Sequence, residues 1–477
     1  MTEILVIGAG VVGGMIAREL TRYTPSVAIA EAACDVALGA TRANSAIVHA
    51  GFDAKEGSLK ALLNVRGSKM MKKVCSELGV KYKNNGSLVV GFNEEDKETL
   101  LGLLERGNKN GVEGLKLLSR EELLSIEPNI GDEVTYALHA PTGAIVCPYE
   151  LCMAAVGNAM DNGASLYLDF KVVSIEKQAN GYLVKAEDGR EIFAKFVVNA
   201  AGAYSDEISA LIGDESFSVK PRRGEYMLLD KECGSLIGHT VFSCPSKMGK
   251  GILVSPTVDG NLLLGPTAED IEDKTDVRTT AEGMAKIRAG VSRQVKGVNF
   301  SKVITSFSGL RAVGSTGDFI ITSPKAGFVN AAGIESPGLS AAPAIAEYVR
   351  DILKEQGLSL NVRPDFNPTR RPMHYFSSLS VEEKNKIIKE NPAFAKIVCR
   401  CELVTEGEIR EAIRTNPPAR DLDGVKRRTR ATMGRCQGGF CSPYIVEILS
   451  EELGIDYTAV TKFGGKSYIN LSKTKEG

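Results

Sequence analysis

The chain has 477 residues, 43% of them hydrophobic and 25% charged, which is typical of globular protein and allows about three domains. A net charge of −1 excludes a general attraction to nucleic acid or to anionic membranes, and no apolar run reaches the roughly 18 residues of a membrane span. Because the N-terminus also lacks a basic leader, we expect a cytoplasmic protein whose ten cysteines are reduced thiols or ligands.

Hydrophobic periodicity predicts an α/β protein interrupted by a second kind of sheet. Strands are predicted at residues 3–7, 26–31, 86–91, 165–176, 182–187, 190–199, 319–322 and 327–331. Helices are predicted at residues 11–23, 58–78, 94–106, 119–125, 148–160, 203–212 and 338–354. Between residues 216 and 306 strand-like stretches dominate, so we expect an antiparallel sheet inserted into the α/β body.

The first strand, helix and second strand form a βαβ unit with a dinucleotide-binding motif. Gly8 allows the tight turn, Gly10 lets the backbone approach a pyrophosphate, and Gly13 lets helix and strand pack closely. Glu31 ends the second strand, where it can accept hydrogen bonds from a ribose. The helix N-terminus offers unpaired N–H groups to the phosphates. This motif alone leaves FAD and NAD open.

Two later strand-to-helix turns favour FAD, because FAD is too long for one βαβ unit to cover. The first contains Gly202, at the end of the predicted strand at residues 190–199. The second contains Gly333 and then Gly338, Leu339 and Ser340, where the last predicted helix begins. Small residues there would let the backbone approach the cofactor.

Three stretches make the chain resemble the glycine oxidase/D-amino acid oxidase-type flavoprotein superfamily: residues 39–52, 223–226 and 308–311. It is most similar to the branch of FAD-dependent glycerol-3-phosphate dehydrogenases and L-2-hydroxyglutarate oxidases, over about residues 1–355. The resemblance implies a Rossmann-type FAD-binding domain and an inserted α+β antiparallel-sheet substrate domain. We expect the first to comprise residues 1–80, 140–215 and 306–356, and the second residues 81–139 and 216–305.

The resemblance also implies which residues contact FAD. The loop after the second strand would wrap the flavin and its phosphates, and the last turn would lie beside the isoalloxazine. The implied positions are Thr41, Arg42, Asn44, Ser45, Val173, Gly338, Leu339 and Ser340. The family usually has glycine where this chain has Ala46.

Oxidation of a secondary alcohol needs a hydride acceptor, a base for the hydroxyl proton and a cation that holds the substrate anion. His49, one of four histidines, lies in the flavin loop and is the candidate base. Arg311 resembles the family's substrate-anion arginine, and its planar fork suits a carboxylate or phosphate. Arg222 and Arg223 could also face an anion, although paired arginines on a strand are commonly one solvated and one ion-paired.

Four cysteines near the C-terminus form two tight pairs. Cys399 and Cys401 are followed, after 34 residues, by Cys436 and Cys441. Such a set suits a metal or iron–sulfur centre. The spacing and flanking residues resemble the bacterioferritin-associated ferredoxin-like [2Fe–2S] domain, which implies that these four thiolates bind the cluster; zinc is the alternative.

Local signals support a small helical module at residues 395–455. Thr405 and Glu408 predict a capping box just after the first cysteine pair. Gly438 and Gly439 would let backbone N–H groups approach the sulfides. Four cations at residues 426–430 are either a solvated helix face or charge compensation for the anionic cluster. The proline-punctuated residues 357–394 are predicted to be a linker and residues 456–477 a tail.

The chain is therefore expected to be a FAD and [2Fe–2S] dehydrogenase for a small anionic hydroxy compound. Glycerol 3-phosphate, oxidised to dihydroxyacetone phosphate, is the first choice, and the electrons would leave through the cluster to a redox partner protein. L-2-hydroxyglutarate is the rival substrate. A non-catalytic electron-transfer subunit that keeps both cofactors is the rival of another class.

Overall fold

A parallel sheet around the N-terminal strand forms the centre of the first domain in the computed structural model, which describes residues 2–245, 251–373 and 375–472. Strand β1 (Thr2–Ile7) lies between β2 (Val27–Ala30) and β12 (Glu191–Asn199), and β20 (Phe328–Ala332) continues the parallel pairing beyond β12. These strands are buried on both faces, which explains the unbroken apolar run in β1.

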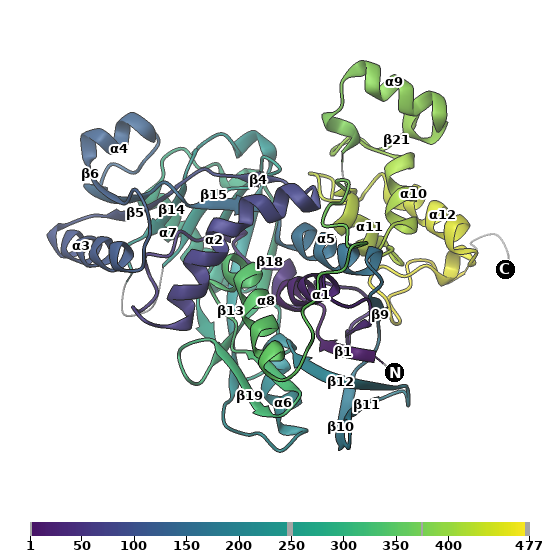
Figure 1. The fold of residues 1–477 in the computed structure, drawn as a ribbon. Helices are drawn as coiled ribbons and strands as arrows, with labels where there is room; N and C mark the ends of the chain where they lie inside the picture. Colours follow the sequence, from purple (N-terminus) through teal and green to yellow (C-terminus); the bar gives the residue numbers. More distant parts are fainter. Residues whose placement is uncertain (1, 246–250, 374, 473–477) are drawn as a thin grey trace.

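Helices α1 (Val11–Thr21), α2 (Leu59–Leu78), α5 (Pro148–Asp161) and α8 (Gly338–Glu355) pack together on one face of this sheet (Figure 1). Alternate residues of β1 divide between the two faces. Ile4 and Val6 belong to the core with these helices, whereas Leu5 and Ile7 belong to the core on the other face.

The other face is covered by a meander that shares a strand with the parallel sheet. The first half of β12 pairs antiparallel with β11 (Gly181–Ala186), which pairs with β10 (Val172–Gln178). The strand predicted at residues 165–176 is wrong as one element. It divides into β9 (Ser165–Tyr167), which pairs with β2, and β10, because the chain turns at Asp169, whose φ is +51°.

A second large sheet carries the inserted domain, as expected. Its strand order is β17-β13-β16-β15-β14-β5-β7-β6, and the long β18 pairs with β13; all these pairs are antiparallel except β14 with β5. The strands are β5 (Ser87–Gly91), β6 (Lys116–Ser119), β7 (Tyr136–Ala140), β13 (Val219–Leu229), β14 (Thr240–Ser243), β15 (Leu253–Pro256), β16 (Leu262–Gly265), β17 (Glu269–Asp270) and β18 (Val303–Gly314). Helices α3 (Glu94–Lys109), α4 (Arg120–Ile126) and α7 (Ala281–Gln294) belong to the same domain.

Shorter elements complete the body. Strands β3 (Ile47–Val48), β4 (Tyr82–Lys83) and β8 (Ala144–Val146) form a small sheet, β19 (Ile320–Lys325) pairs with β20, and α6 (Ser205–Ala210) follows β12. Among the described residues, no helix is both long and apolar enough to cross a membrane.

The C-terminal module lies beside α1 and α5, on the side of the molecule away from α3 and α4 (Figure 1). It contains β21 (Ile397–Cys399), β22 (Val404–Thr405), α10 (Glu406–Arg414), α11 (Leu422–Thr429) and α12 (Ser442–Leu453). The predicted capping box is confirmed, since Thr405 Oγ1 accepts from Glu408 N at 3.3 Å while the Glu408 carboxylate accepts from Thr405 N at 3.0 Å.

The described residues of the segment predicted as a linker, 357–373 and 375–394, include a helix and make contacts with the body. The segment contains α9 (Val381–Glu390), and its first part lies against the domain of the parallel sheet. Arg363 N donates to Arg22 O at 2.9 Å, and Asn367 O accepts from Asn158 Nδ2 at 3.0 Å. These contacts fasten the first part of the segment to the body.

Candidate active site

The glycines of the turn after β1 allow other atoms to approach the backbone closely. Gly8 has φ +104°, and a Cβ there would overlap the Ala200 carbonyl oxygen, whereas a Cβ on Gly13 would overlap the Gly8 carbonyl oxygen. A Cβ on Gly10 would meet only Thr41 Oγ1, at 3.4 Å. Gly8 and Gly13 are thus required by the fold, whereas the space beside Gly10 is available to a ligand at the N-terminus of α1.

Glu31 stands beside this turn. Its carboxylate accepts from Ala9 N at 2.7 Å and from Ala33 N at 3.0 Å. Burial raises the pKa of Glu31, and these two N–H donors oppose that effect. An acidic side chain anchored at the end of β2 fits the ribose of a dinucleotide.

The first residues of α1 and α8, Val11 and Gly338, line a small cavity of about 130 Å³. It brings together residues that the sequence placed in separate stretches. Its lining includes the predicted positions Thr41, Asn44, Ser45, His49, Arg311, Gly338 and Leu339. Ser340 lies just behind this wall, where its Oγ accepts from His49 N at 2.7 Å. The cavity that these residues form fits the isoalloxazine end of FAD.

Other predicted cofactor positions lie outside that lining. Val173 is on β10 with 44% of its surface exposed, and Gly202 and Gly333 adopt φ of +59° and +60° at the two later turns. Arg42 lies over the ring of Phe463, with its guanidinium carbon 4.9 Å from the ring centre. The cofactor roles of these residues stay predictions.

The unusual alanine in the flavin loop has a left-handed backbone. Ala46 has φ +61°, a conformation that glycine adopts without steric cost. Asn44 holds the loop there, because its Oδ1 accepts from Ala46 N at 2.8 Å and its Nδ2 donates to Thr41 O at 2.9 Å.

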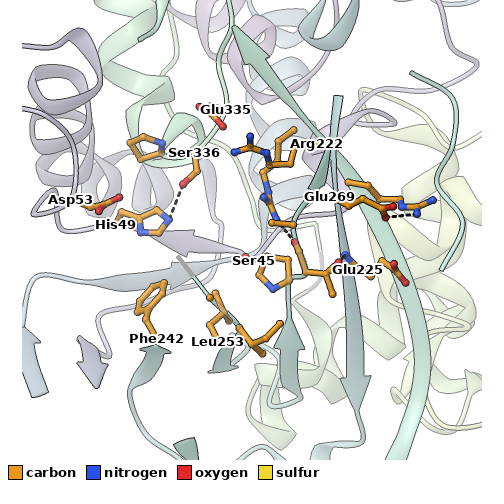
Figure 2. A pocket seen from close by; sticks show the side chains of 18 of the residues that line it. Ser45, His49, Asp53, Arg222, Glu225, Phe242, Leu253, Glu269, Glu335 and Ser336 are labelled. Carbon is orange, nitrogen blue, oxygen red and sulfur yellow. Dashed lines mark hydrogen bonds and ion pairs between the residues drawn. The ribbon is translucent and has the colours of Figure 1, made fainter. Parts of the chain in front are cut away.

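A larger chamber of about 630 Å³ adjoins the small cavity, and Figure 2 shows its lining. Ser45, His49, Arg311, Glu335, Ser336 and Pro337 line both. His49 Nε2 lies 3.3 Å from Ser336 Oγ, and the His49 ring lies 5.8 Å from that of Phe242. His49 is thus on the boundary between the two spaces. His139 and His239 line neither space, and His374 lies outside the described residues.

The three candidate arginines differ in their partners. Arg223 is buried and pairs with Glu269 at 2.5 Å and Asp276 at 2.8 Å, and Arg222 pairs with Asp270 at 2.5 Å. Arg311 lies opposite Arg222 in the β13–β18 register. Its Nη2 donates to the backbone oxygen of Thr267 at 2.8 Å.

Of the chamber cations that the structure describes, Arg311 is therefore the one available to an anion. Lys60 pairs with Glu335 at 2.7 Å, and Lys286 pairs with Glu282 at 2.6 Å. Within the described ranges, Arg311 is the chamber cation to which no carboxylate is paired. Gly224 leaves room for it, since a Cβ there would lie 2.5 Å from Arg311 Nη2.

Two residues that line the small cavity, Ser336 and Tyr226, were not predicted as site residues from the sequence. Ser336 holds the His49 ring, and Tyr226 lines the small cavity with its Oη 3.3 Å from Ser45 Oγ. The stretch at residues 223–226 had marked Tyr226 only as part of a family pattern. No local sequence pattern could predict the contact of Ser336 with His49, because the two residues are 287 positions apart in the sequence.

The four C-terminal thiols form two pairs. Cys401 Sγ and Cys436 Sγ are 3.7 Å apart, which fits two ligands of one tetrahedral metal at about 2.3 Å each. Cys399 and Cys441, both 1% exposed, form the other pair. Among the described residues, no three Cys, His, Asp or Glu side chains surround a single ion position. Four thiols in two close pairs are the ligand set of a [2Fe–2S] cluster and also of a structural zinc ion.

The surroundings favour one thiolate in each pair, because the proton that each pair shares stays on Cys441 and on Cys401, whose pKa values are raised. A hydrogen bond from Cys441 lowers the pKa of Cys399 to about 6, with help from backbone N–H groups. Burial opposes ionisation of Cys436, and the backbone N–H groups of Gly438, Phe440 and Gly439 lower its pKa nonetheless. The approach of these N–H groups to the sulfides stays a prediction.

The interpretation of the basic run at residues 426–430 as a solvated helix face is wrong for its arginines, whereas charge compensation for the cluster stays a prediction. Arg427 and Arg428 are buried and bind Asp35 of the FAD-binding domain at 2.7 Å each. Arg430 binds Asp259 at 2.7 Å and Glu402 at 2.9 Å. These arginines dock the module onto the body.

Comparisons with known proteins agree with this geometry. A family model described as FAD dependent oxidoreductase matches residues 3–352, and a BFD-like [2Fe-2S] binding domain matches residues 397–451. A glycerol 3-phosphate dehydrogenase of Caloramator mitchellensis is 48% identical, covering 100% of this chain and 99% of the relative. A mitochondrial L-2-hydroxyglutarate dehydrogenase of Mus musculus is 34% identical over 55% of this chain and 60% of the relative.

A solved structure is similar to most of the chain. The dithionite-reduced L-alpha-glycerophosphate oxidase from Mycoplasma pneumoniae with FAD bound has a TM-score of 0.73 and 31% identity, covering 77% of this chain and 98% of that one. The fold class, the family resemblance and the two expected cofactors, FAD and a [2Fe–2S] cluster, are confirmed by these matches.

Proposed function

The chain belongs to the FAD dependent oxidoreductase family and carries a BFD-like [2Fe-2S] binding domain, and on this premise we propose that it oxidises glycerol 3-phosphate to dihydroxyacetone phosphate. The observation that carries the proposal is Arg311, an available guanidinium on the wall shared by the flavin cavity and the chamber. The relative named glycerol 3-phosphate dehydrogenase, similar over its whole length, supports the choice of substrate.

Arg311 would bind the phosphate of the substrate. A guanidinium donates two parallel hydrogen bonds to an anion, which fixes the distance and direction of the rest of the molecule. The carbinol carbon would then lie toward the small cavity, with the hydroxyl toward His49.

His49 would take the hydroxyl proton on Nε2. Ser336 Oγ, 3.3 Å from that atom, and the Ser340 hydroxyl bound to His49 N would hold the ring in position. The oxidation removes one proton to His49 and one hydride from the carbon, so the alcohol becomes a ketone. When bound, FAD supplies the hydride acceptor and the [2Fe–2S] cluster a one-electron exit toward a redox partner protein.

Among the residues that the structure describes, the number of available chamber cations disfavours L-2-hydroxyglutarate. Its second carboxylate would need another guanidinium or ammonium, and Lys60, Arg222 and Lys286 are paired with acids. A non-catalytic subunit would have no need for an available arginine beside the flavin.

Initial rates with an artificial dye as acceptor test the proposal. Glycerol 3-phosphate should give a kcat/KM well above that of L-2-hydroxyglutarate and of glycerol, which lacks the anion. A higher kcat/KM for L-2-hydroxyglutarate would replace the proposed substrate, and no turnover with any of the three would favour the non-catalytic alternative.

A further inference from the structure

Side chains from two helices hold His49 by its backbone as well as by its ring. Ser340 Oγ, on α8, accepts from His49 N at 2.7 Å, and Ser336 Oγ lies 3.3 Å from His49 Nε2 (Figure 2). On the carbonyl side, Asn64 Nδ2 donates to His49 O at 3.2 Å, while Asn64 Oδ1 accepts from Gly51 N at 3.2 Å. Asn64 therefore bridges the loop directly after the proposed base.

Asn64 lies in α2 and lines the chamber. The residue is 1% exposed, and a buried amide needs hydrogen-bond partners for its polar atoms. An amide donates from its nitrogen and accepts at its oxygen, which matches a carbonyl and an N–H group of the same loop. Aspartate could only accept, and it would place a charge beside the carbonyl oxygen of His49. Asparagine is therefore the side chain that this contact requires.

The helix that carries Asn64 is fixed on both sides of it. At the start of α2, Leu59 N and Lys60 N donate to the Asp318 carboxylate at 2.8 and 2.9 Å. Three residues after Asn64, and on the same face of the helix, a Cβ on Gly67 would overlap the backbone oxygen of Ser340. Helices α2 and α8 therefore approach each other closely here, and each contributes one side chain to the backbone of the proposed base.

A second asparagine holds the same loop farther along the chain. The loop turns at Gly51, whose φ of +119° is one that glycine adopts without steric cost. Asn110, at the end of α3, donates from Nδ2 to Gly51 O at 3.0 Å and to Ala54 O at 2.9 Å. Asn64 thus holds the side of the turn that includes His49, and Asn110 holds the side that leads away from it.

We propose that Asn64 is a positioning residue for the oxidation, which holds His49 in the orientation where Nε2 takes the hydroxyl proton of the substrate. Asn64 acts through the His49 backbone, because the direction of the ring depends on the Cα–Cβ bond that this backbone fixes. A displacement of about 1 Å at a reacting group can lower the rate about 10²-fold. This inference rests on the proposed function, in which His49 is the base.

Rapid-mixing measurements of anaerobic flavin reduction in the full-length, FAD-loaded protein test the proposal. Asn64→Asp and Asn64→Ala should lower the limiting rate of reduction by glycerol 3-phosphate about 10–100-fold, with the half-saturating concentration within about two-fold of the original. Asn110→Ala is the matched control and should be reduced at the unchanged rate. An unchanged rate in both Asn64 variants, or an equal slowing in Asn110→Ala, would overturn the proposal. Loss of FAD from both Asn64 variants would overturn it too, because the residue then supports the fold as a whole.

A double substitution separates positioning of His49 from general support of the site. If Asn64 acts through His49, adding Asn64→Ala to His49→Gln should slow flavin reduction no further, whereas independent effects multiply. Multiplied effects would overturn this inference alone. An unchanged rate in His49→Gln would instead overturn the proposed role of His49, and this inference with it.

A spectroscopic measurement is independent of the substrate. The chain has four histidines, so selective ¹⁵N labelling of histidine gives a nuclear magnetic resonance spectrum with few signals. In Asn64→Ala the His49 signals, identified by their absence from His49→Gln, should shift or broaden, while those of His139 and His239 stay. Unchanged His49 signals would overturn the inference, even if glycerol 3-phosphate bleached no flavin and the proposed function itself had failed.

Discussion

Asp35→Asn tests the docking of the C-terminal module directly. Asp35 is 4% exposed, and its carboxylate accepts from Arg427 Nη2 and Arg428 Nη2 at 2.7 Å and from Arg428 Nη1 at 2.8 Å. Asparagine keeps the size but removes the charge, which leaves two buried guanidiniums without their anion. Breaking one partner of a buried ion pair costs about 3–5 kcal/mol.

The same contact has a predicted pH dependence. Burial would raise the pKa of Asp35, but Arg428 and Arg427 outweigh it and hold the pKa at about 2, below the ordinary 3.8. A carboxyl whose folded-state pKa is depressed contributes stability that is complete above its unfolded pKa and is lost as pH falls through the folded one. The difference corresponds to about 2 kcal/mol, lost between about pH 4 and pH 2. This loss of stability at low pH is smaller than the loss expected for Asp35→Asn, because a protonated carboxyl still accepts hydrogen bonds.

Urea unfolding and limited proteolysis at residues 357–394 provide the readouts. Asp35→Asn should unfold at lower urea and release the module faster, and the difference from the unchanged protein should shrink toward pH 2. Glu113→Gln, in an exposed pair with Lys69, should behave like the unchanged protein. Identical unfolding and identical cleavage rates for Asp35→Asn at pH 7 would refute the docking role of this contact.

Four further substitutions test the site. His49→Gln should slow flavin reduction by about 10²–10⁴-fold while substrate binding changes little, and unchanged reduction kinetics would remove His49 as the base. Arg311→Met should weaken substrate binding by about 10–100-fold, from the loss of a charge-assisted contact, and an unchanged KM would contradict its role. Cys436→Ser should abolish the iron–sulfur absorbance while substrate still bleaches the flavin, whereas loss of zinc, found by metal analysis, would reverse the assignment of the module. Ala46→Gly should raise the stability of the FAD-loaded protein by about 1 kcal/mol, because glycine adopts φ +61° without strain, and a lowered melting temperature would count against this reasoning.

Features that depend on local sequence were predicted well. The apolar run of β1, the glycine turn that follows it and the capping box of Thr405 and Glu408 each lie within a few residues, so their patterns are visible directly. The residues that line the small cavity were predicted only through the family resemblance. They are separated by up to nearly 300 positions, so hydrophobic periodicity cannot show that they lie together.

Long-range charge pairing could not be predicted. Asp35 and Arg428 are 393 positions apart, and a basic run in α11 has the same local pattern whether it faces water, a cluster or a buried carboxylate. The break of the strand at residues 165–176 was also missed, because it depends on pairing to β2 at one end and to β11 at the other.

Anaerobic titration of the purified protein with glycerol 3-phosphate, followed in the visible spectrum, tests the central claim most directly. We predict that the flavin absorbance bleaches with about one equivalent and that the iron–sulfur absorbance declines after it. A flavin that stays oxidised with excess glycerol 3-phosphate, in protein whose FAD dithionite reduces normally, would contradict the account.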